Sequence, residues 1–367
     1  MQEMTISPAR VAPNVDPNAV TNEEDRNLVT IETITALNPI ADADLIEAAT
    51  IRGWIVVVKK GELAVGDPVA YFEIDSLLPL DDPRFAFLAP RGEKVIDGVR
   101  FHVLGTARLR GVYSQGLVIA LSELPELAGL PAGTDVSDRL SITKWVEPIP
   151  EHLREQICAG FPTRHARVTG AMRVQNLTDD ILTALPAKGR FAAAEKVDGA
   201  SMTVFNDAGR LRVAGRNWEF RAPANQATAN NQWKLANSLD LLSSIPQGWI
   251  VQGEQYGEGT PNNRNPLKIR GSRFAVFSVL RGLGDHVPRD QWPAELAALA
   301  VPVHDLPFPT TVAQALTQVD RLKSLIAPGR IAEGVVWHDL EGNTFPELNG
   351  RDGFKAVSNH YLTKNGG

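Results

Sequence analysis

The chain has a single cysteine, Cys158, among its 367 residues, so it cannot form an internal disulfide. That usage is typical of proteins in a reducing cytoplasm. With one cysteine and scattered histidines, no zinc-ligand spacing appears. No stretch approaches the ~20 consecutive apolar residues of a membrane helix, and the N-terminus lacks the basic start and apolar core of a signal peptide. We therefore expect a cytoplasmic protein with no membrane partner.

Basic residues are also fewer than acidic residues. The formal net charge of −6 argues mildly against a nucleic-acid partner, because contacts to phosphates need cations. The charges are unevenly spread, however. Residues 1–26 hold five acids and two bases, whereas residues 203–282 hold ten bases and five acids. The second segment is therefore basic, although an ordinary solvated surface explains it equally well before any motif is considered.

The length of the chain favours two domains over one. Residues 1–26 are polar, contain three prolines and show no periodicity, so we expect a disordered lead. Residues 27–165 hold short apolar or alternating runs, separated by turn signals and followed by a connector rich in Pro, Glu and Leu. These runs predict a sandwich or a small barrel, including the oligonucleotide/oligosaccharide-binding (OB) barrel.

Residues 166–367 mix strand and helix patterns. Apolar or alternating segments predict six strands: Phe191–Phe205, Arg210–Ala214, Gly248–Tyr256, Arg273–Leu280, Glu333–His338 and Gly353–Val357. Three further segments predict helices: Gln232–Ser244, Asp290–Ala300 and Val312–Ile326. A strand-dominated domain with helices between its strands indicates an α+β architecture rather than a doubly wound one.

The tetrapeptide Lys196-Val197-Asp198-Gly199 lies between two strand-like stretches, where its lysine suits a nucleophile at a strand end. A nucleophilic lysine must be neutral, yet a free lysine has a pKa of roughly 10.4. Burial, neighbouring cations or a metal must therefore favour the neutral amine. Attack on a triphosphate also needs further cations and a divalent metal held by carboxylates. The tetrapeptide alone is weak evidence for a nucleophilic lysine, so the interpretation depends on whether such partners follow it in the chain.

Suitable partners do follow, in a fixed order: Arg216 after a strand, Glu254 on an apolar strand, Phe277 on the next, Glu333 at a strand start, and Lys355 near the C-terminus. Each has a duller reading as an exposed strand acid, a core aromatic ring or a solvated lysine. The occurrence of all these residues together, in this order along the chain, outweighs those separate explanations. The series resembles the motifs of covalent nucleotidyltransferases, the superfamily of ATP-dependent DNA ligases, RNA ligases and mRNA capping enzymes.

The resemblance implies a role for each residue. Lys196 would attack the α-phosphorus of ATP, expel pyrophosphate and carry AMP as a phosphoramide. Glu333 would organise Mg²⁺ or Mn²⁺, partly through water, and Lys355 would neutralise the α-phosphate. The others would bind the nucleotide: Glu195 and Val197 near the adenine, Asp198 and Gly199 in a turn whose glycine lets the backbone approach the nucleotide, Arg216 at the ribose or incoming end, Glu254 at a ribose hydroxyl, and Phe277 stacked on the adenine.

One position departs from the superfamily pattern. The last motif usually reads Lys-x-Lys, whereas this chain has Lys355-Ala356-Val357, so one phosphate-binding cation is missing. Three basic residues are candidates to replace it: Lys268, Arg270 and Lys364. The gap also supports an alternative, a nucleic-acid-binding protein whose catalytic domain has decayed. Retention of the other motif residues argues against that alternative.

The order of the domains indicates which members of the superfamily the chain resembles most. DNA ligases and capping enzymes generally carry an OB domain after the catalytic domain, but only 12 residues follow Lys355 here, so we expect no such domain. The order instead resembles RNA ligases of the Deinococcus type, and residues 52–79 and 107–117 look like that family's first domain. The resemblance implies an N-terminal OB barrel followed by a mixed, mainly antiparallel nucleotidyltransferase domain of ATP-grasp-like ligase fold.

The implied reaction is RNA joining. AMP would pass from the lysine to a 5′-phosphate end, and a 3′-hydroxyl would then displace it, with a paired nick ending in ribose as the expected substrate. An OB barrel can hold such a strand through a basic groove, for which Arg100, Arg108 and Arg110 are candidates. Exposed strand arginines explain them equally well. Joining of DNA ends remains an alternative within the same class of enzyme.

Overall fold

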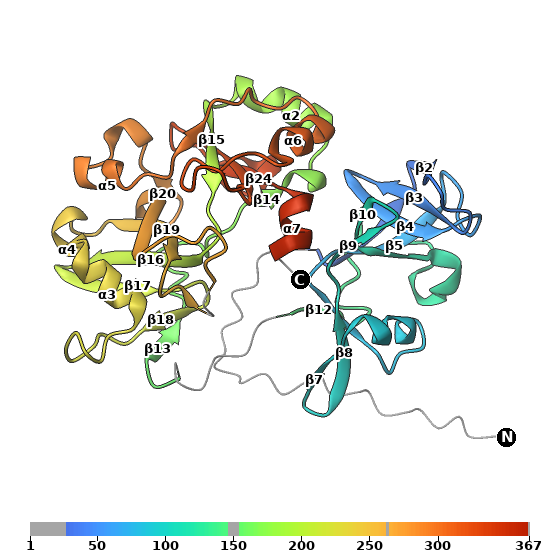
Figure 1. Ribbon diagram of the computed structural model, residues 1–367, viewed down its shortest axis with the longest axis horizontal. Coiled ribbons are helices and arrows are strands. Elements are labelled where there is room, and N and C mark those ends of the chain that lie inside the picture. Colours follow the sequence, from blue (N-terminus) through green and yellow to red (C-terminus); the bar gives the residue numbers. More distant parts are fainter. Residues whose placement is uncertain (1–26, 146–153, 262–263, 366–367) are drawn as a thin grey trace.

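The computed structural model of the protein describes residues 27–145, 154–261 and 264–365. They form two domains that lie side by side, with the last helix between them (Figure 1). The lead that we expected over residues 1–26 lies outside the described residues. Within the described part of the chain, no helix is long and apolar enough to cross a membrane.

The N-terminal domain is built from antiparallel strands, as its alternating runs predict. The strands are β1 (Val29–Thr33), β2 (Ala36–Pro39), β3 (Ile46–Ile51), β4 (Trp54–Lys59), β5 (Pro68–Phe72), β6 (Ser76–Pro79), β7 (Lys94–Ile96), β8 (Val99–Val103), β9 (Thr106–Leu109), β10 (Val112–Gln115), β11 (Leu117–Ala120) and β12 (Thr143–Lys144). Short 3-10 helices are η1 (Ala86–Arg91), η2 (Leu121–Glu123) and η3 (Pro125–Leu127). The sheet orders are β1-β5-β11, β2-β3-β4, β9-β10 and β12-β6-β8-β7. Two apolar clusters fill the domain, one around Phe72 and one around Trp54.

The C-terminal domain holds two larger sheets. One has seven strands in the order β13-β18-β17-β16-β19-β20-β21, and the other has five in the order β14-β24-β23-β15-β22. The strands are β13 (Ile157–Gly160), β14 (Met172–Arg173), β15 (Phe191–Lys196), β16 (Ala200–Asp207), β17 (Arg210–Ala214), β18 (Trp218–Phe220), β19 (Ile250–Gly257), β20 (Ser272–Gly282), β21 (Asp285–His286), β22 (Val303–His304), β23 (Gly334–Asp339) and β24 (Gly353–Val357). Only β14 and β24 pair in parallel within these two sheets of the described chain. The domain is thus mainly antiparallel, as expected.

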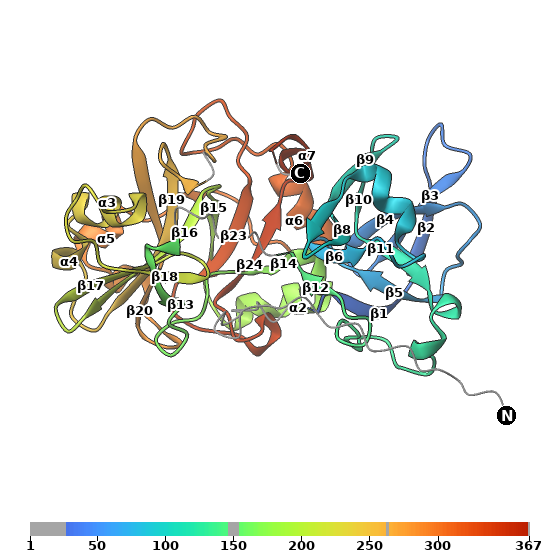
Figure 2. The ribbon, with the colours of Figure 1, turned by 90° about the horizontal axis from the view of Figure 1, so that it is seen from below.

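Helices cover the outer faces of both sheets (Figure 2). They are α2 (Asp179–Ala184), α3 (Asn231–Ser238), α4 (Leu241–Ser244), α5 (Ala294–Ala298) and α6 (Val312–Val319), with 3-10 turns η4 (Val174–Asn176), η5 (Leu185–Ala187), η7 (Arg289–Gln291) and η8 (Pro346–Leu348). The last helix, α7 (Asn359–Asn365), lies between the two domains instead. Apolar residues of α3 and α4 pack on the seven-stranded sheet, and those of α2 and α6 pack on the five-stranded sheet. The inner faces of the two sheets are therefore left to build a site between them.

Several predicted elements are shorter than the patterns indicate. The strand expected over Phe191–Phe205 is two strands, because the turn at residues 197–199 carries the chain from one sheet to the other. The helix expected over Gln232–Ser244 breaks where Asp240 adopts φ +47°. That expected over Asp290–Ala300 begins only after Pro293. The third ends at Val319, so Asp320–Ile326 is not helical.

The two domains contact each other through main-chain and side-chain hydrogen bonds. The Gly53 N–H donates to the Gln175 carbonyl at 3.2 Å, and the Trp54 indole N–H donates to Asn176 Oδ1 at 2.7 Å. The Arg173 guanidinium lies over the Trp54 ring, 5.9 Å from its centroid. This packing joins the barrel to the edge of the five-stranded sheet, where Lys355 on β24 pairs with Arg173 on β14.

Candidate active site

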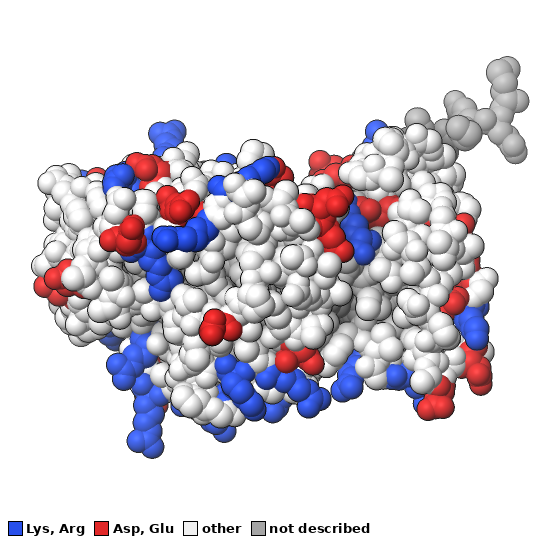
Figure 3. Space-filling model, turned by 90° about the horizontal axis from the view of Figure 1, so that it is seen from above, with Lys and Arg blue, Asp and Glu red and all other residues white. Residues whose placement is uncertain are grey.

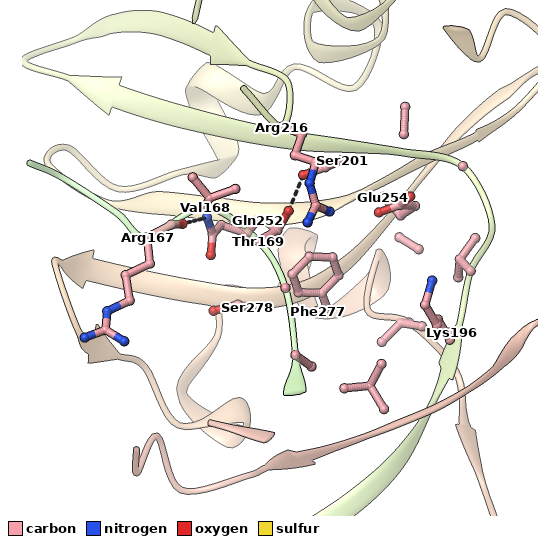
Figure 4. Close-up of a pocket in the computed structure, with 18 of the residues that line it drawn as sticks. Arg167, Val168, Thr169, Lys196, Ser201, Arg216, Gln252, Glu254, Phe277 and Ser278 are labelled. Atoms are coloured by element: carbon pink, nitrogen blue, oxygen red, sulfur yellow. Dashed lines mark hydrogen bonds between the residues drawn. The ribbon is translucent and has the colours of Figure 1, made fainter. Parts of the chain in front are cut away.

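A cavity of about 510 Å³ lies between the two sheets of the C-terminal domain (Figure 4). That volume suits a small-molecule ligand. Hydrogen bonds fix one wall: the Thr169 and Ser201 hydroxyls are 2.5 Å apart, and the Gln252 amide donates to the Arg167 carbonyl at 2.9 Å. Eight of the predicted site residues line the cavity: Glu195, Lys196, Val197, Gly199, Arg216, Glu254, Phe277 and Lys355.

Lys196 ends β15 and is half-buried at the cavity. Its Nζ lies 2.7 Å from Oε2 of Glu333, which directly precedes β23, the strand paired with β15. Glu333 is only 9% exposed, so its carboxylate is largely removed from water. A buried carboxylate needs a cation or hydrogen-bond donors, and Lys196 supplies both. The two residues therefore form one unit.

Glu254 projects from β19 into the same cavity, where β19 pairs with β16 and β20. Burial raises the pKa of the Glu254 carboxyl to about 7, with Lys196 opposing the rise and Glu333 adding to it. A carboxyl that gains a proton near neutral pH, beside an ion pair in a cavity, is a feature typical of functional sites.

An aromatic ring lines the cavity between the sheets. Phe277 on β20 stacks on His338 of β23, with ring centroids 5.8 Å apart and an interplanar angle of 8°. His338 Nδ1 lies 2.9 Å from Asp352 Oδ2. Burial acts to raise the pKa of Asp352, but the charge and hydrogen bond of His338 outweigh it and hold that pKa at about 2. The Asp352 carboxylate thereby fixes the ring on which Phe277 rests.

Basic side chains line the cavity from several loops and strands. They are Arg167, Arg216, Arg264, Arg351 and Lys355. Val357, where the superfamily pattern expects a second lysine, is 3% exposed and pairs with Gly334 in the sheet. The three proposed replacements, Lys268, Arg270 and Lys364, do not line the cavity. Arg264, Arg351 and Arg167 supply cationic charge there instead, and sequence reasoning missed them because no motif marks them.

The turn after Lys196 is held on several sides. The Asp198 carboxylate accepts hydrogen bonds from the Tyr361 hydroxyl, at 2.7 Å, and from Arg264 Nε. A Cβ on Gly199 would lie 2.1 Å from the Gln255 carbonyl oxygen. Gly199 therefore lets the backbone approach strand β19, and because it also lines the cavity, its approach to the nucleotide stays a prediction. Val197 is buried against residues of both sheets.

Glu195 lines the cavity, but its carboxylate is bound on the other side of the strand. Successive side chains of a strand face opposite sides, so Glu195 faces the opposite side from Lys196. Its carboxylate accepts hydrogen bonds from the Ser324 hydroxyl at 2.5 Å and the Leu325 N–H at 2.6 Å, and it lies 3.2 Å from His304 Nε2. Only the backbone of Glu195 is thus available to a ligand, in agreement with the alternation of side chains along a strand.

The three arginines proposed to hold nucleic acid lie in the N-terminal domain, outside the cavity. Arg100 on β8 pairs with Asp81 at 3.2 Å and Glu93 at 3.7 Å. Arg108 on β9 lies over the Tyr113 ring, 5.3 Å from its centroid, and Arg110 forms the turn to β10 with φ +48°. On the face seen in Figure 3, basic side chains collect along one edge, and acidic and basic side chains mix elsewhere. All three arginines are exposed.

A second cavity, of about 300 Å³, adjoins the first between the two domains. Arg167, Arg351 and Lys355 line both cavities. Arg52 from the N-terminal domain and Arg173 from the C-terminal domain line the second alone, together with Glu73 and Glu347. The basic wall of the first cavity therefore continues to the domain interface.

Comparisons with known proteins give a match within each domain. A family model described as an OB-fold domain matches residues 28–121, and one described as RNA ligase matches residues 189–357. Among solved structures, an apo mutant of Naegleria gruberi RNA ligase is 34% identical with a TM-score of 0.78, and the match covers 92% of this chain and 98% of that one.

Other structures of the same Naegleria protein agree. A mutant with ATP and Mn is 33% identical, with a TM-score of 0.77 over 92% of this chain and 98% of that one. A structure with PPi is 34% identical, with a TM-score of 0.76 over the same shares. No curated protein sequence gives a match. Identity above 30% over nearly the whole of both chains fixes the family: the chain belongs to the RNA ligases, with an N-terminal OB-fold domain followed by the ligase domain.

Proposed function

We propose that the protein is an ATP-dependent RNA ligase that seals a 3′-hydroxyl end to a 5′-phosphate end through a lysyl-AMP on Lys196. The observation that carries this proposal is the Lys196–Glu333 pair, 2.7 Å apart, whose lysine lines a cavity together with an aromatic ring, a carboxyl and several cations. Similar structures that contain ATP or AMP with Mn support the choice of nucleotide. The barrel-first domain order supports the Deinococcus type.

Adenylylation begins with nucleophilic attack by Lys196. Its Nζ attacks the α-phosphorus, an N–P bond forms, and the bond to pyrophosphate breaks. The ammonium must first lose a proton, for which Glu333 is the neighbouring acceptor. Phe277 offers the face on which the adenine stacks, and Glu254 faces a ribose hydroxyl. Only the backbone of Glu195 can contact the base, because its carboxylate is bound elsewhere.

Phosphate charge is met by the basic wall. We place the α-phosphate at Lys355 and Arg264, and the leaving pyrophosphate toward the second cavity, where Arg173 and Arg52 lie. Cations fixed in position stabilise negative charge as it develops in the transition state. After AMP has moved to the 5′-phosphate end, the 3′-hydroxyl of the other strand attacks that end and AMP leaves.

The residues present fit a divalent metal that is shared with the nucleotide. No cluster of three acidic, His or Cys side chains able to hold a metal occurs among the described residues. Mg²⁺ or Mn²⁺ commonly binds through one or two carboxylates together with substrate phosphates, and Glu333 supplies such a carboxylate beside the nucleophile. When bound, the metal would neutralise phosphate charge.

The test is transfer of label from ATP to the protein. We expect that protein incubated with α-labelled ATP and Mg²⁺ or Mn²⁺ acquires an acid-labile label, located by peptide mapping at Lys196. A protein that stays unlabelled would support the alternative of a decayed nucleic-acid-binding protein. The intact Lys196–Glu333 pair favours the enzyme.

Substrate class is tested with nicked duplexes. We expect faster sealing when the 3′-hydroxyl strand ends in RNA than when it ends in DNA, with single-stranded ends as a third comparison. Equal rates on RNA and DNA ends would remove the preference for RNA and favour the DNA-joining alternative.

Removal of Arg173 should weaken ATP binding. We expect Arg173→Gln to raise the KM for ATP in lysine adenylylation about tenfold, the scale of a lost hydrogen bond to a charged group. Sealing of a nick whose 5′ end already carries AMP should change little, because no pyrophosphate is involved. Arg164→Gln, on an exposed arginine of the same domain, is the matched control. An unchanged KM would contradict the placement of pyrophosphate at the domain interface.

A further inference from the structure

The last helix reaches the turn that carries the nucleophile. Helix α7 lies between the two domains (Figure 1) and packs against β9 of the barrel. Tyr361 on this helix is 3% exposed, and its hydroxyl donates to Asp198 Oδ2 at 2.7 Å. Tyr361 is 163 positions from Asp198 in the chain, and it does not line the nucleotide cavity.

Asp198 is a buried carboxylate, 5% exposed. Such a group is costly to bury unless donors satisfy it. Tyr361 and Arg264 donate to its two oxygens from separate parts of the chain. Burial and the bond to Asp198 both raise the pKa of the Tyr361 phenol, so it remains a donor through neutral pH. The carboxylate is therefore fixed between the C-terminal helix and the loop that carries Arg264.

Movement of Asp198 would move Lys196, which is two residues away. The chain crosses from one sheet to the other at this turn, so Lys196 and Gly199 are anchored to different sheets. The carboxylate of Asp198 adds a polar anchor between those two ends. An attacking nitrogen must be held within a fraction of an ångström of its productive position.

We infer that Tyr361 is a positioning residue for lysine adenylylation, acting through its hydrogen bond to Asp198 to hold the Lys196 turn. The inference rests on the proposed function. It assigns to the hydroxyl of Tyr361 an effect on the rate of attack rather than on nucleotide affinity, since the ring lies outside the cavity. Because α7 also packs on β9, the same helix links the barrel to the nucleophile.

Tyr361→Phe tests this role, because it removes the hydroxyl and keeps the ring. We expect lysine adenylylation at saturating ATP to slow about tenfold, the scale of a hydrogen bond to a charged group, with the KM for ATP within about twofold of its original value. Thr363→Val on the same helix is the control, since the Thr363 hydroxyl donates to main-chain carbonyls of α7. Thermal unfolding of each variant identifies any general loss of structure.

A double variant separates positioning from packing. If the hydroxyl acts through Asp198, then Tyr361→Phe added to Asp198→Asn should cost far less than Tyr361→Phe alone. Additive losses, an equal loss in Thr363→Val, or an unchanged rate in folded Tyr361→Phe would each overturn the inference while the parent protein still labels. A parent protein that does not label would instead reject the proposed function.

Discussion

Lys196→Ala is expected to abolish transfer of AMP from ATP to the protein. The covalent step depends on the amine of Lys196, so labelling with α-labelled ATP should fall at least about 1,000-fold. Sealing of an ordinary 5′-phosphate nick with ATP should be lost in parallel. Lys188→Ala is the matched control, because Lys188 is exposed and pairs with Glu347 outside the larger cavity. Labelling of the Lys196 variant at a parental rate would reject lysyl-AMP at this position.

The same variant should retain part of the last step. When the 5′ end already carries AMP, the attacking group is the 3′-hydroxyl, and Lys196 is no longer needed as a nucleophile. We therefore expect Lys196→Ala to seal such a nick measurably, above the background without protein. Loss of this activity in a folded variant would mean that Lys196 also stabilises the departing AMP.

Removal of Lys196 also has a structural effect that must be measured separately. Glu333 keeps its carboxylate largely buried but loses the cation 2.7 Å away. Removing one partner of such a pair destabilises a fold, by about 3–5 kcal/mol where burial is complete and less here. A lowered Tm with normal sealing of the pre-activated nick would show that destabilisation does not explain the loss of labelling.

Local sequence patterns predicted those features of the site that depend on residues close together in the chain. Strand alternation and the Asp-Gly turn placed Lys196 at the end of a strand. The predicted strands also bring Glu254 and Phe277 to the cavity and Glu333 to the side chain of Lys196. The expectation that Glu195 lies near the adenine did not take strand alternation into account, by which its side chain faces the opposite side from Lys196. These features follow from the two-residue alternation of strands and from the residues that favour turns, both of which can be recognised in a single sequence.

Contacts between distant segments could not be predicted in this way. Tyr361 and Arg264 meet at Asp198 only because the two sheets, a loop and the last helix converge there. Neither belongs to a motif, and neither lies on a periodic pattern. Predicted helices were likewise too long, since Asp240 and Pro293 end or delay them for local backbone reasons that a hydrophobic stripe does not reveal.

Glu254→Gln is expected to make the protein more stable at alkaline pH while impairing its activity. Burial raises the pKa of Glu254 to about 7, whereas the unfolded chain ionises near 4.5. Between these values the folded state holds a proton that the unfolded state has released, so stability falls as pH rises. The fall is complete above the folded pKa. At about 1.4 kcal/mol per pKa unit, the cost reaches roughly 3–3.5 kcal/mol.

Glutamine removes that cost because it does not ionise. The free energy of unfolding of Glu254→Gln, relative to the parent protein, should therefore increase from pH 4 to pH 8 by roughly 3 kcal/mol, as denaturant titrations at each pH would measure. Glu295→Gln, on an exposed glutamate of α5, should show no such trend. A constant difference between variant and parent across this pH range would contradict a raised pKa at Glu254.

Activity should change in the opposite direction. Glutamine keeps the size of the side chain but loses the charge that accepts a ribose hydroxyl, so we expect lysine adenylylation to slow about 10- to 100-fold, the scale of a hydrogen bond to a charged group. A variant that is more stable but reacts more slowly indicates that the replaced group serves function although it destabilises the fold. If Glu254→Gln kept full activity as well as the added stability, the carboxylate would have no part in nucleotide binding.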